Sequence, residues 1–408
     1  MIRPERRTRA DLLAAAGIAA VVALLVAALW WHSSARATVS LPAVSPAPTV
    51  ETATAVPQAL RQKWTTASPK TLAPIVLKGT VITGEGREMT GLDPFTGAQR
   101  WLYARDAELC AVSHVYDLAV AVYPDARGCG QVSSVKADTG TRGPARTSYA
   151  DKQVSVTSNG STVLSTGPTR LELWRSDLVR MLSYGEIDAR VKPVNRGRGA
   201  GCALLSAAAS DAAAAVLESC PDQDDPRLTV LIPGKEEDEP ETKYVPLPGL
   251  AVDSEARVLA VVGTTTAVYL PTPTPEVAVY DETATKVSGT VLRVPAEVDG
   301  AVPAVTRAGD YVTWWTGAAV MVFDDKLDYR YTLDATGPLR ALGPATMMAG
   351  RLLVPVEGGL AVFNPANGEN ERLIAVAHPP GRDAVVPAVA GSLVLEQRGP
   401  ALTVFGPP

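Results

Sequence analysis

The apolar and polar positions of this chain follow a unit that recurs eight times. Each unit has an apolar run, a short polar turn, a second apolar run, a Gly-containing turn and a third run that ends near Asp or Asn. Thr346–Asn364 and Pro387–Phe405 show the unit most plainly. Because one such unit cannot bury its apolar face alone, a repeat on this scale predicts sheets that stack or radiate around an axis.

The spacing of the units indicates the architecture. The third runs end near Asp93, Asp138, Asp177, Pro233, Asp281, Asp324, Asn364 and Phe405. The intervals between these ends match the length of one four-stranded blade of a β-propeller. Such propellers usually have about 4–8 blades. We therefore predict an all-β fold, an eight-bladed β-propeller. A seven-bladed ring, with the Ala-rich unit as the doubtful blade, is the alternative; an open β-solenoid fits poorly because the units are long and variable.

A fourth, outer strand is expected after the third run of a unit. Candidates are Arg100–Tyr103, Val179–Ser183, Tyr329–Thr332 and Arg372–Ala375. The last unit has no room for one before Pro408, whereas Leu60–Thr65 precedes the first unit without inner strands of its own. Pairing of Leu60–Thr65 with Leu402–Phe405 would close the ring and remove an open sheet edge.

The N-terminal part has a different pattern. Leu12–Trp31 contains no charged residue and is long enough, at about 1.5 Å per residue, to cross the ~30 Å hydrocarbon core of a bilayer. Four arginines precede it, which marks that side as cytoplasmic. We predict a cytoplasmic tail at 1–11 and a single transmembrane helix at 12–31. A cleaved signal peptide, with its site at Ala35–Ala37, is the alternative, although its apolar region is usually shorter. Both place the rest of the chain outside the cytoplasm.

Residues 32–57 form a Pro/Ala/Thr-rich linker before the propeller, which is assigned to residues 58–408. From Thr38 to Pro57 the only charged residue is Glu51, so this stretch cannot build a core. Its prolines predict an extended spacer that reaches ~60 Å.

The four cysteines, Cys110, Cys129, Cys202 and Cys220, allow three pairings. In the register of the repeat, Cys110 opens a first strand and Cys129 follows the second strand of the same unit. Cys202 and Cys220 hold the same places two units later. Adjacent antiparallel strands bring such residues within bonding distance, so we predict disulfides Cys110–Cys129 and Cys202–Cys220 in an oxidising compartment. Metal binding is disfavoured, because the chain has no Cys-x-x-Cys pair and its histidines are remote.

The predicted Cys202–Cys220 disulfide decides between helix and strand for Ala203–Leu217. Its alanines favour a helix by propensity. A helix would hold Cys202 and Cys220 ~27 Å apart, which is too far for a disulfide. We therefore predict a hairpin that turns near Ser210-Asp211.

One turn carries a family resemblance. In Gly91–Trp101, the residues Asp93, Thr96, Gly97 and Trp101 stand where the repeat of the quinoprotein-like (PQQ-like) β-propellers has Asp, Thr, Gly and Trp. The resemblance implies that Asp93 caps the turn, Gly97 takes its strained conformation and Trp101 packs between blades. Lys136–Gly140 and Phe363–Gly368 are similar copies without the Trp.

Some members of this family are quinone-dependent dehydrogenases with a Ca²⁺ site, a catalytic Asp and often a vicinal disulfide. This chain has no Cys-Cys pair and no recognisable cluster of that kind. It is more similar to the non-catalytic members, such as the BamB-like outer-membrane assembly lipoproteins, with a transmembrane anchor in place of the lipid. Its Ala- and Val-rich composition also resembles that of actinobacterial envelope proteins.

Candidate chemistry adds little to this picture. The net charge of −5 does not support nucleic-acid binding. The three histidines, His32, His114 and His378, have no triad pattern around them. We expect no enzymatic activity, cofactor or metal. The sequence predicts a membrane-anchored extracytoplasmic scaffold for envelope or membrane proteins; a quinone-dependent oxidoreductase and a propeller that binds glycans or solutes are the alternatives.

Overall fold

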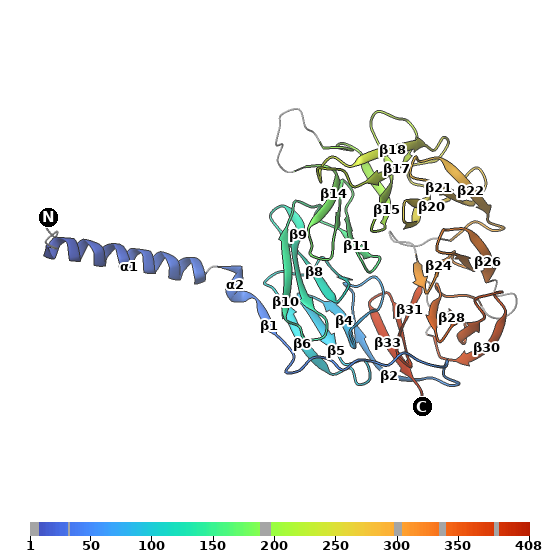
Figure 1. Cartoon of the computed structure of the whole chain (residues 1–408), viewed down its shortest axis with the longest axis horizontal. Coiled ribbons are helices and arrows are strands. Elements are labelled where there is room, and N and C mark those ends of the chain that lie inside the picture. The colour runs from blue at the N-terminus through green and yellow to red at the C-terminus, as the bar shows by residue number, and fades with distance from the viewer. Residues whose placement is uncertain (1–7, 32, 188–196, 298–303, 334–339, 379–382) are drawn as a thin grey trace.

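The computed structural model describes residues 8–31, 33–187, 197–297, 304–333, 340–378 and 383–408. Helix α1 (Arg9–Trp31) and the short helix α2 (Ser34–Ala37) precede a ring of eight antiparallel sheets, shown face-on in Figure 1. The predicted all-β, eight-bladed propeller is therefore confirmed, and the seven-bladed ring is excluded.

Blades 1 to 4 run from the inner to the outer strand in chain order. Blade 1 has β3 (Ile75–Leu77), β4 (Thr80–Glu85), β5 (Glu88–Leu92) and β6 (Gln99–Ala104). Blade 2 has β7 (Ala111–Val115), β8 (Leu118–Asp125), β9 (Gly128–Lys136) and β10 (Arg142–Thr147). Blade 3 has β11 (Ser155–Ser158), β12 (Val163–Thr166), β13 (Arg170–Trp174) and β14 (Arg180–Gly185). Blade 4 has β15 (Ala203–Ala209), β16 (Ala214–Ser219), β17 (Arg227–Ile232) and β18 (Glu241–Pro246).

Blades 5 to 8 continue the same order. Blade 5 has β19 (Arg257–Val262), β20 (Thr265–Leu270), β21 (Glu276–Tyr280) and β22 (Lys286–Val291). Blade 6 has β23 (Val305–Ala308), β24 (Tyr311–Trp315), β25 (Val320–Phe323) and β26 (Tyr329–Leu333). Blade 7 has β27 (Thr346–Met348), β28 (Arg351–Val356), β29 (Gly359–Phe363) and β30 (Asn370–Ala375). Blade 8 has β31 (Val385–Ala390), β32 (Leu393–Arg398), β33 (Ala401–Gly406) and, as its outer strand, β2 (Arg61–Ala67).

The apolar core lies between the blades. Eight clusters of buried side chains occupy the eight blade-to-blade interfaces, including the interface of blade 8 with blade 1. The middle strands are buried on both faces, so they read as continuous apolar runs such as Leu360–Phe363. This packing explains the repeat, because each unit covers its neighbour and is covered in turn.

The ring closes between the two ends of the propeller sequence, as predicted. Strand β2 pairs antiparallel with β33, with Trp64 opposite Val404 and Thr65 opposite Thr403. The hydroxyl oxygens of Thr65 and Thr403 lie 3.2 Å apart. The four outer strands predicted from the sequence are also present, as β6, β14, β26 and β30.

The Ala-rich stretch forms the predicted hairpin of β15 and β16. The hydroxyl of Ser210 accepts hydrogen bonds from the backbone N–H groups of Ala212 and Ala213, both at 3.0 Å, and so closes the turn. The same hydroxyl donates to the carbonyl of Gly263 in blade 5 at 2.6 Å. Packing between blades thus outweighs the helix propensity of alanine.

Helix α1 is exposed along its whole length and begins with a capping box. The hydroxyl of Thr8 accepts from the Asp11 N–H at 3.2 Å, and the Asp11 carboxylate accepts from the Thr8 N–H at 2.8 Å. Its length and composition suit a membrane span; a secretion signal near the N-terminus has the same properties.

Residues 39–57, which we call the strap, do not extend away from the ring as the spacer prediction expects. Strand β1 (Val39–Leu41) adds a fifth strand to the outer edge of blade 1, opposite Leu102–Ala104. The N–H groups of Ala43 and Ala47 donate to the carbonyls of Thr139 and Asp138 in blade 2, at 2.8 and 2.9 Å.

The strap then runs past the paired strands β2 and β33 and reaches blade 7, along the lower edge of the ring in Figure 1. Arg372 of blade 7 donates to the carbonyls of Val56 and Pro57, at 2.9 and 3.0 Å. A Pro-rich segment builds no core, but its stiff backbone loses little entropy when the blades supply its hydrogen-bond partners. Consequently, only residues 32–38 separate α1 from the propeller. The boundaries of the linker and the propeller stay a prediction.

Candidate functional site

Three of the motif residues, Asp93, Thr96 and Gly97, lie in the turn between β5 and β6 of blade 1, and Trp101 lies in β6. A carboxylate oxygen of Asp93 accepts from the N–H groups of Phe95 and Thr96, at 3.0 and 3.1 Å, and from the Thr96 hydroxyl at 3.1 Å. Gly97 has φ +72° and donates its N–H to the Asp93 carbonyl. Trp101 is buried, and its indole N–H donates to the carbonyl of Ala137 in blade 2 at 2.7 Å. The motif therefore joins two blades.

The same arrangement occurs at two further interfaces that the sequence analysis missed. The indole N–H of Trp64, in blade 8, donates to the carbonyl of Pro94 in blade 1 at 3.0 Å. The hydroxyl of Tyr331, in blade 6, donates to the carbonyl of Pro365 in blade 7 at 2.6 Å. At all three interfaces the receiving turn ends in a glycine with positive φ that faces the aromatic ring: Gly97, Gly140 and Gly368. An outer-strand aromatic one unit before each such turn is the sequence signal.

The disulfides pair Cys110 with Cys129 and Cys202 with Cys220, as the spacing predicts. Their positions in the blade differ. Cys202 and Cys220 extend the ladder of β15 and β16, directly beyond the partners Ala203 and Ser219. Cys110 precedes β7, whereas Cys129 lies in the third strand, β9, so this bridge joins the first and third strands of blade 2.

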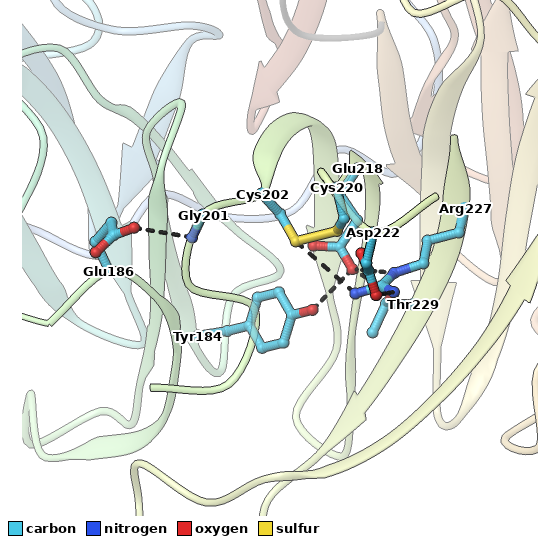
Figure 2. Close-up of a disulfide and its surroundings, with 9 residues drawn as sticks. All are labelled: Tyr184, Glu186, Gly201, Cys202, Glu218, Cys220, Asp222, Arg227 and Thr229. Carbon is cyan, nitrogen blue, oxygen red and sulfur yellow. Dashed lines mark hydrogen bonds and ion pairs between the residues drawn. A yellow bond between two sulfur atoms is a disulfide. The ribbon is translucent and has the colours of Figure 1, made fainter. Parts of the chain in front are cut away.

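A buried carboxylate lies beside the second disulfide (Figure 2). Glu218 of β16 is fully buried, and one of its oxygens accepts from the Tyr184 hydroxyl at 2.7 Å, the Arg227 Nε at 2.9 Å and the Thr229 hydroxyl at 2.6 Å. Burial, followed by the charge of Glu218, raises the pKa of Tyr184 above its usual range, so the phenol keeps its proton and donates. Since Tyr184 belongs to blade 3, this network joins blades 3 and 4.

The donor atoms of Cys202, Glu218 and Cys220 all lie within 4.8 Å of one another. Metals bind the thiolate form of cysteine, and here the two sulfurs are bonded to each other. The Arg227 guanidinium also lies beside the carboxylate, where it supplies the compensating positive charge. The cluster fits a structural role for Glu218 and does not fit a metal site in the oxidised protein.

A second buried carboxylate, Glu172 of β13, joins blades 2 and 3. Its oxygens lie within 2.6 to 3.2 Å of guanidinium nitrogens of three arginines: Arg146, Arg170 and Arg180. The indole N–H of Trp174 donates to it at 2.8 Å. Burial alone would raise the pKa of Glu172, but the three arginines outweigh it and hold the pKa below its usual value. Arg180 also pairs with Glu237 of blade 4, so one network spans three blades.

The histidines do not form a catalytic constellation in the described part of the chain. Both ring nitrogens of His378 are occupied, one by the carboxylate of Glu396 and the other by the carbonyl of Val356, each at 2.9 Å. Burial opposes protonation of His378, but the hydrogen bond and charge of Glu396, with the Val356 carbonyl, outweigh burial and raise its pKa. Burial lowers the pKa of His114. His32 lies outside the described residues.

The central channel holds a cavity of about 440 Å³. Aliphatic side chains of the inner strands form much of its wall, including those of Ala207–Ala209, Leu259–Val262 and Val386–Val389. Its lining includes two basic residues, His114 and Arg307, and no carboxylate among the described residues. The size falls within the range of small-molecule sites, roughly 300–1,000 Å³.

Comparisons with known proteins identify the fold and no family. No family model matches the sequence, and no curated protein resembles it. Saccharomyces cerevisiae Sqt1 has a similar structure, with a TM-score of 0.52 and 10% identity over 88% of this chain and 100% of that chain. The chain is an eight-bladed β-propeller.

Two further solved structures match at lower similarity. The WD40 domain of Neurospora crassa Pan2 has a TM-score of 0.41 and 13% identity, over 74% of this chain and 90% of that chain. A chain of a mitotic checkpoint complex has a TM-score of 0.45 and 8% identity, over 89% and 96%.

Substitution of Gly140 tests the aromatic docking between blades. A Cβ at this position would lie 2.5 Å from the Cβ of Trp101, and φ is +69°. Gly350 is the matched control, because its φ of +73° is similar and nothing lies within 4 Å of its Cβ position. Both Ala variants carry the strain of positive φ, about 1–2 kcal/mol. Gly140→Ala adds an overpacking cost of about 1–3 kcal/mol. Thermal unfolding should show the larger loss for Gly140→Ala, and equal losses would contradict the docking role.

The His378–Glu396 pair predicts a pH dependence of stability. In the folded protein the pKa of His378 is raised above its ordinary 6.5. The contribution of the pair to the free energy of unfolding is therefore complete below pH 6.5, and it is lost as the pH rises through the folded-state pKa. His378→Gln should flatten the fall in unfolding free energy above pH 6.5. His114→Gln is the control, because a lowered pKa gives the opposite slope, at lower pH. An unchanged slope in denaturant titrations of His378→Gln would contradict the assignment.

Proposed function

We propose that this protein is a membrane-anchored, extracytoplasmic scaffold whose propeller binds partner proteins of the cell envelope. The strap is the observation that carries the proposal. Because β1 is paired with β6, only residues 32–38 remain between the end of α1 and the ring. Fully extended, these residues span at most about 25 Å. The ring is thus held close to the surface that α1 enters, as suits a fixed platform.

Two other observations support this placement. The disulfides Cys110–Cys129 and Cys202–Cys220 suit an oxidising compartment. The charged residues buried most deeply, Glu172 and Glu218, are engaged in ties between blades rather than directed into a cavity. A rigid ring whose buried carboxylates link its own blades fits a binding platform better than a catalytic fold.

We also propose that the quinoprotein-like propellers are relatives, of the non-catalytic, BamB-like type. The docking of Trp101, Trp64 and Tyr331 on the turn of the next blade supports this relationship. A quinone-dependent dehydrogenase fits less well. Its Ca²⁺ would need carboxylate ligands, and the channel lining has none among the described residues.

Binding of a solute in the channel is the second candidate function. The cavity of about 440 Å³, with Arg307 and His114 on an otherwise mostly aliphatic wall, favours a small amphipathic molecule. Such a ligand would raise the thermal unfolding temperature of the full chain by mass action.

A crosslinking pull-down from membranes tests the scaffold proposal. The bait is the tagged full-length chain, and the control is residues 1–57 joined to an unrelated soluble domain, which keeps the helix and the strap sequence. We expect a small set of envelope proteins recovered at least tenfold over the control. Each should recover the propeller in the reciprocal experiment and bind it saturably when purified. Equal recovery with bait and control would contradict the proposal.

A further inference from the structure

We propose that the groove between the outer strands of blades 1 and 2 binds the anionic headgroup of a membrane phospholipid. This inference rests on the anchoring role proposed for α1. The groove has a volume of about 420 Å³, and β6, β9 and β10 supply most of its lining. Thr38, which immediately precedes β1, also lines it. The groove therefore lies where the chain passes from the anchor into the propeller.

The floor of the groove is preformed. Tyr103 of β6 and Ser133 of β9 line it, and their hydroxyl oxygens lie 3.0 Å apart across the blade interface. Tyr103 is itself buried and packs against Tyr123 of β8. A ligand would therefore meet a floor that is already rigid and already hydrogen-bonded.

Two arginines give the groove its charge. The guanidinium of Arg142 lies 5.6 Å from the ring centroid of Tyr103, and that of Arg105 lies 5.5 Å from the centroid of Tyr123. No carboxylate in the described part of the chain pairs with either arginine, and the described lining contains no Asp or Glu. Stacking on a ring leaves the N–H edges of a guanidinium available, and these edges match phosphate oxygens.

The other polar residues of the groove are already engaged. Arg146 is committed to Glu172 at 3.2 Å, and the amide of Gln131 donates to Asp125 at 2.7 Å. The positive charge available to a ligand thus comes from Arg105 and Arg142. It is a local feature, since the protein as a whole carries a net charge of −5.

The position of the groove near the end of α1 favours a membrane lipid as the source of the anion. Trp30 and Trp31 end α1, as aromatic residues do at a membrane interface. The guanidinium of Arg36 lies over the Trp31 ring at 3.7 Å, and Thr38 of the groove follows two residues later. Arg36 therefore lies in the short segment that joins α1 to the groove, and the groove itself holds Arg105 and Arg142. Each basic residue near an anionic surface contributes about 1 kcal/mol of attraction.

Lipid binding to the purified full-length chain tests the proposal. The protein is held in a neutral detergent, and native mass spectrometry follows titration with phosphatidylglycerol or phosphatidylcholine. We expect a preference for phosphatidylglycerol. Arg105→Gln/Arg142→Gln should weaken phosphatidylglycerol binding about 30-fold, the factor that corresponds to ~1 kcal/mol for each lost arginine. Arg105→Lys/Arg142→Lys keeps the charge and should lose less.

The matched control is Arg61→Gln/Lys63→Gln on β2, which removes two charges from another outer strand. An equal loss in both Gln pairs, or no preference between the lipids, would overturn the proposal. Glycerophosphoglycerol supplies the same phosphodiester anion in soluble form. If it binds at the lipid concentrations and depends on both arginines, the groove is a site for a soluble anion and the lipid assignment is wrong.

The result is separable from the scaffold proposal. Lipid binding is measured without partners, whereas partner recovery and carbonate extraction of membranes report on the scaffold and on the anchor. Suppose that Arg105→Gln/Arg142→Gln stays in the membrane, keeps its partners and retains the wild-type preference for phosphatidylglycerol. The lipid proposal for the groove would then be wrong, and the scaffold proposal would stand.

Discussion

The pairing of β2 with β33 is the constraint on which the rest of the structure depends. It joins residues 61–67 to residues 401–406 and completes blade 8 with a strand from the other end of the propeller. Without this ladder, blades 1 and 8 would each present an uncovered face, and the ring would have an open edge. The strap depends on the same closure, because its contacts fall on blades 1 and 2 on one side and blade 7 on the other.

Closure also explains how polar groups are used in this fold. The described residues form no single central core; eight apolar interfaces between blades carry the packing instead. Buried charges tie these interfaces together, as Glu172 does for blades 2 to 4 and Glu218 for blades 3 and 4. Such networks are costly to break, because removing one partner leaves a buried charge uncompensated. What remains for function lies on surfaces: the channel, the faces of the ring and the groove beside α1.

The sequence predicts those features that have a period or a local signature. The eight units, the hairpin at Ser210, the two disulfide pairs and the closing strand at Trp64 all follow from apolar spacing or from residue type. The strap contacts do not, because backbone groups of an aperiodic segment make them. Nor do the partners of Glu218 and Glu172, which come in part from neighbouring blades. Arg105 and Arg142 belong to different units, so only the folded ring shows that they share a groove.

A designed cross-link measures the closure directly. Thr65 and Thr403 are partners in the β2–β33 ladder, and their hydroxyl oxygens are 3.2 Å apart. In the full-length protein, Thr65→Cys/Thr403→Cys should form a disulfide on mild oxidation, seen as a linked peptide pair after digestion. Thr65→Cys/Thr332→Cys, with the second cysteine in blade 6, should not. Absence of the first link, or equal yields of both, would contradict closure of the ring.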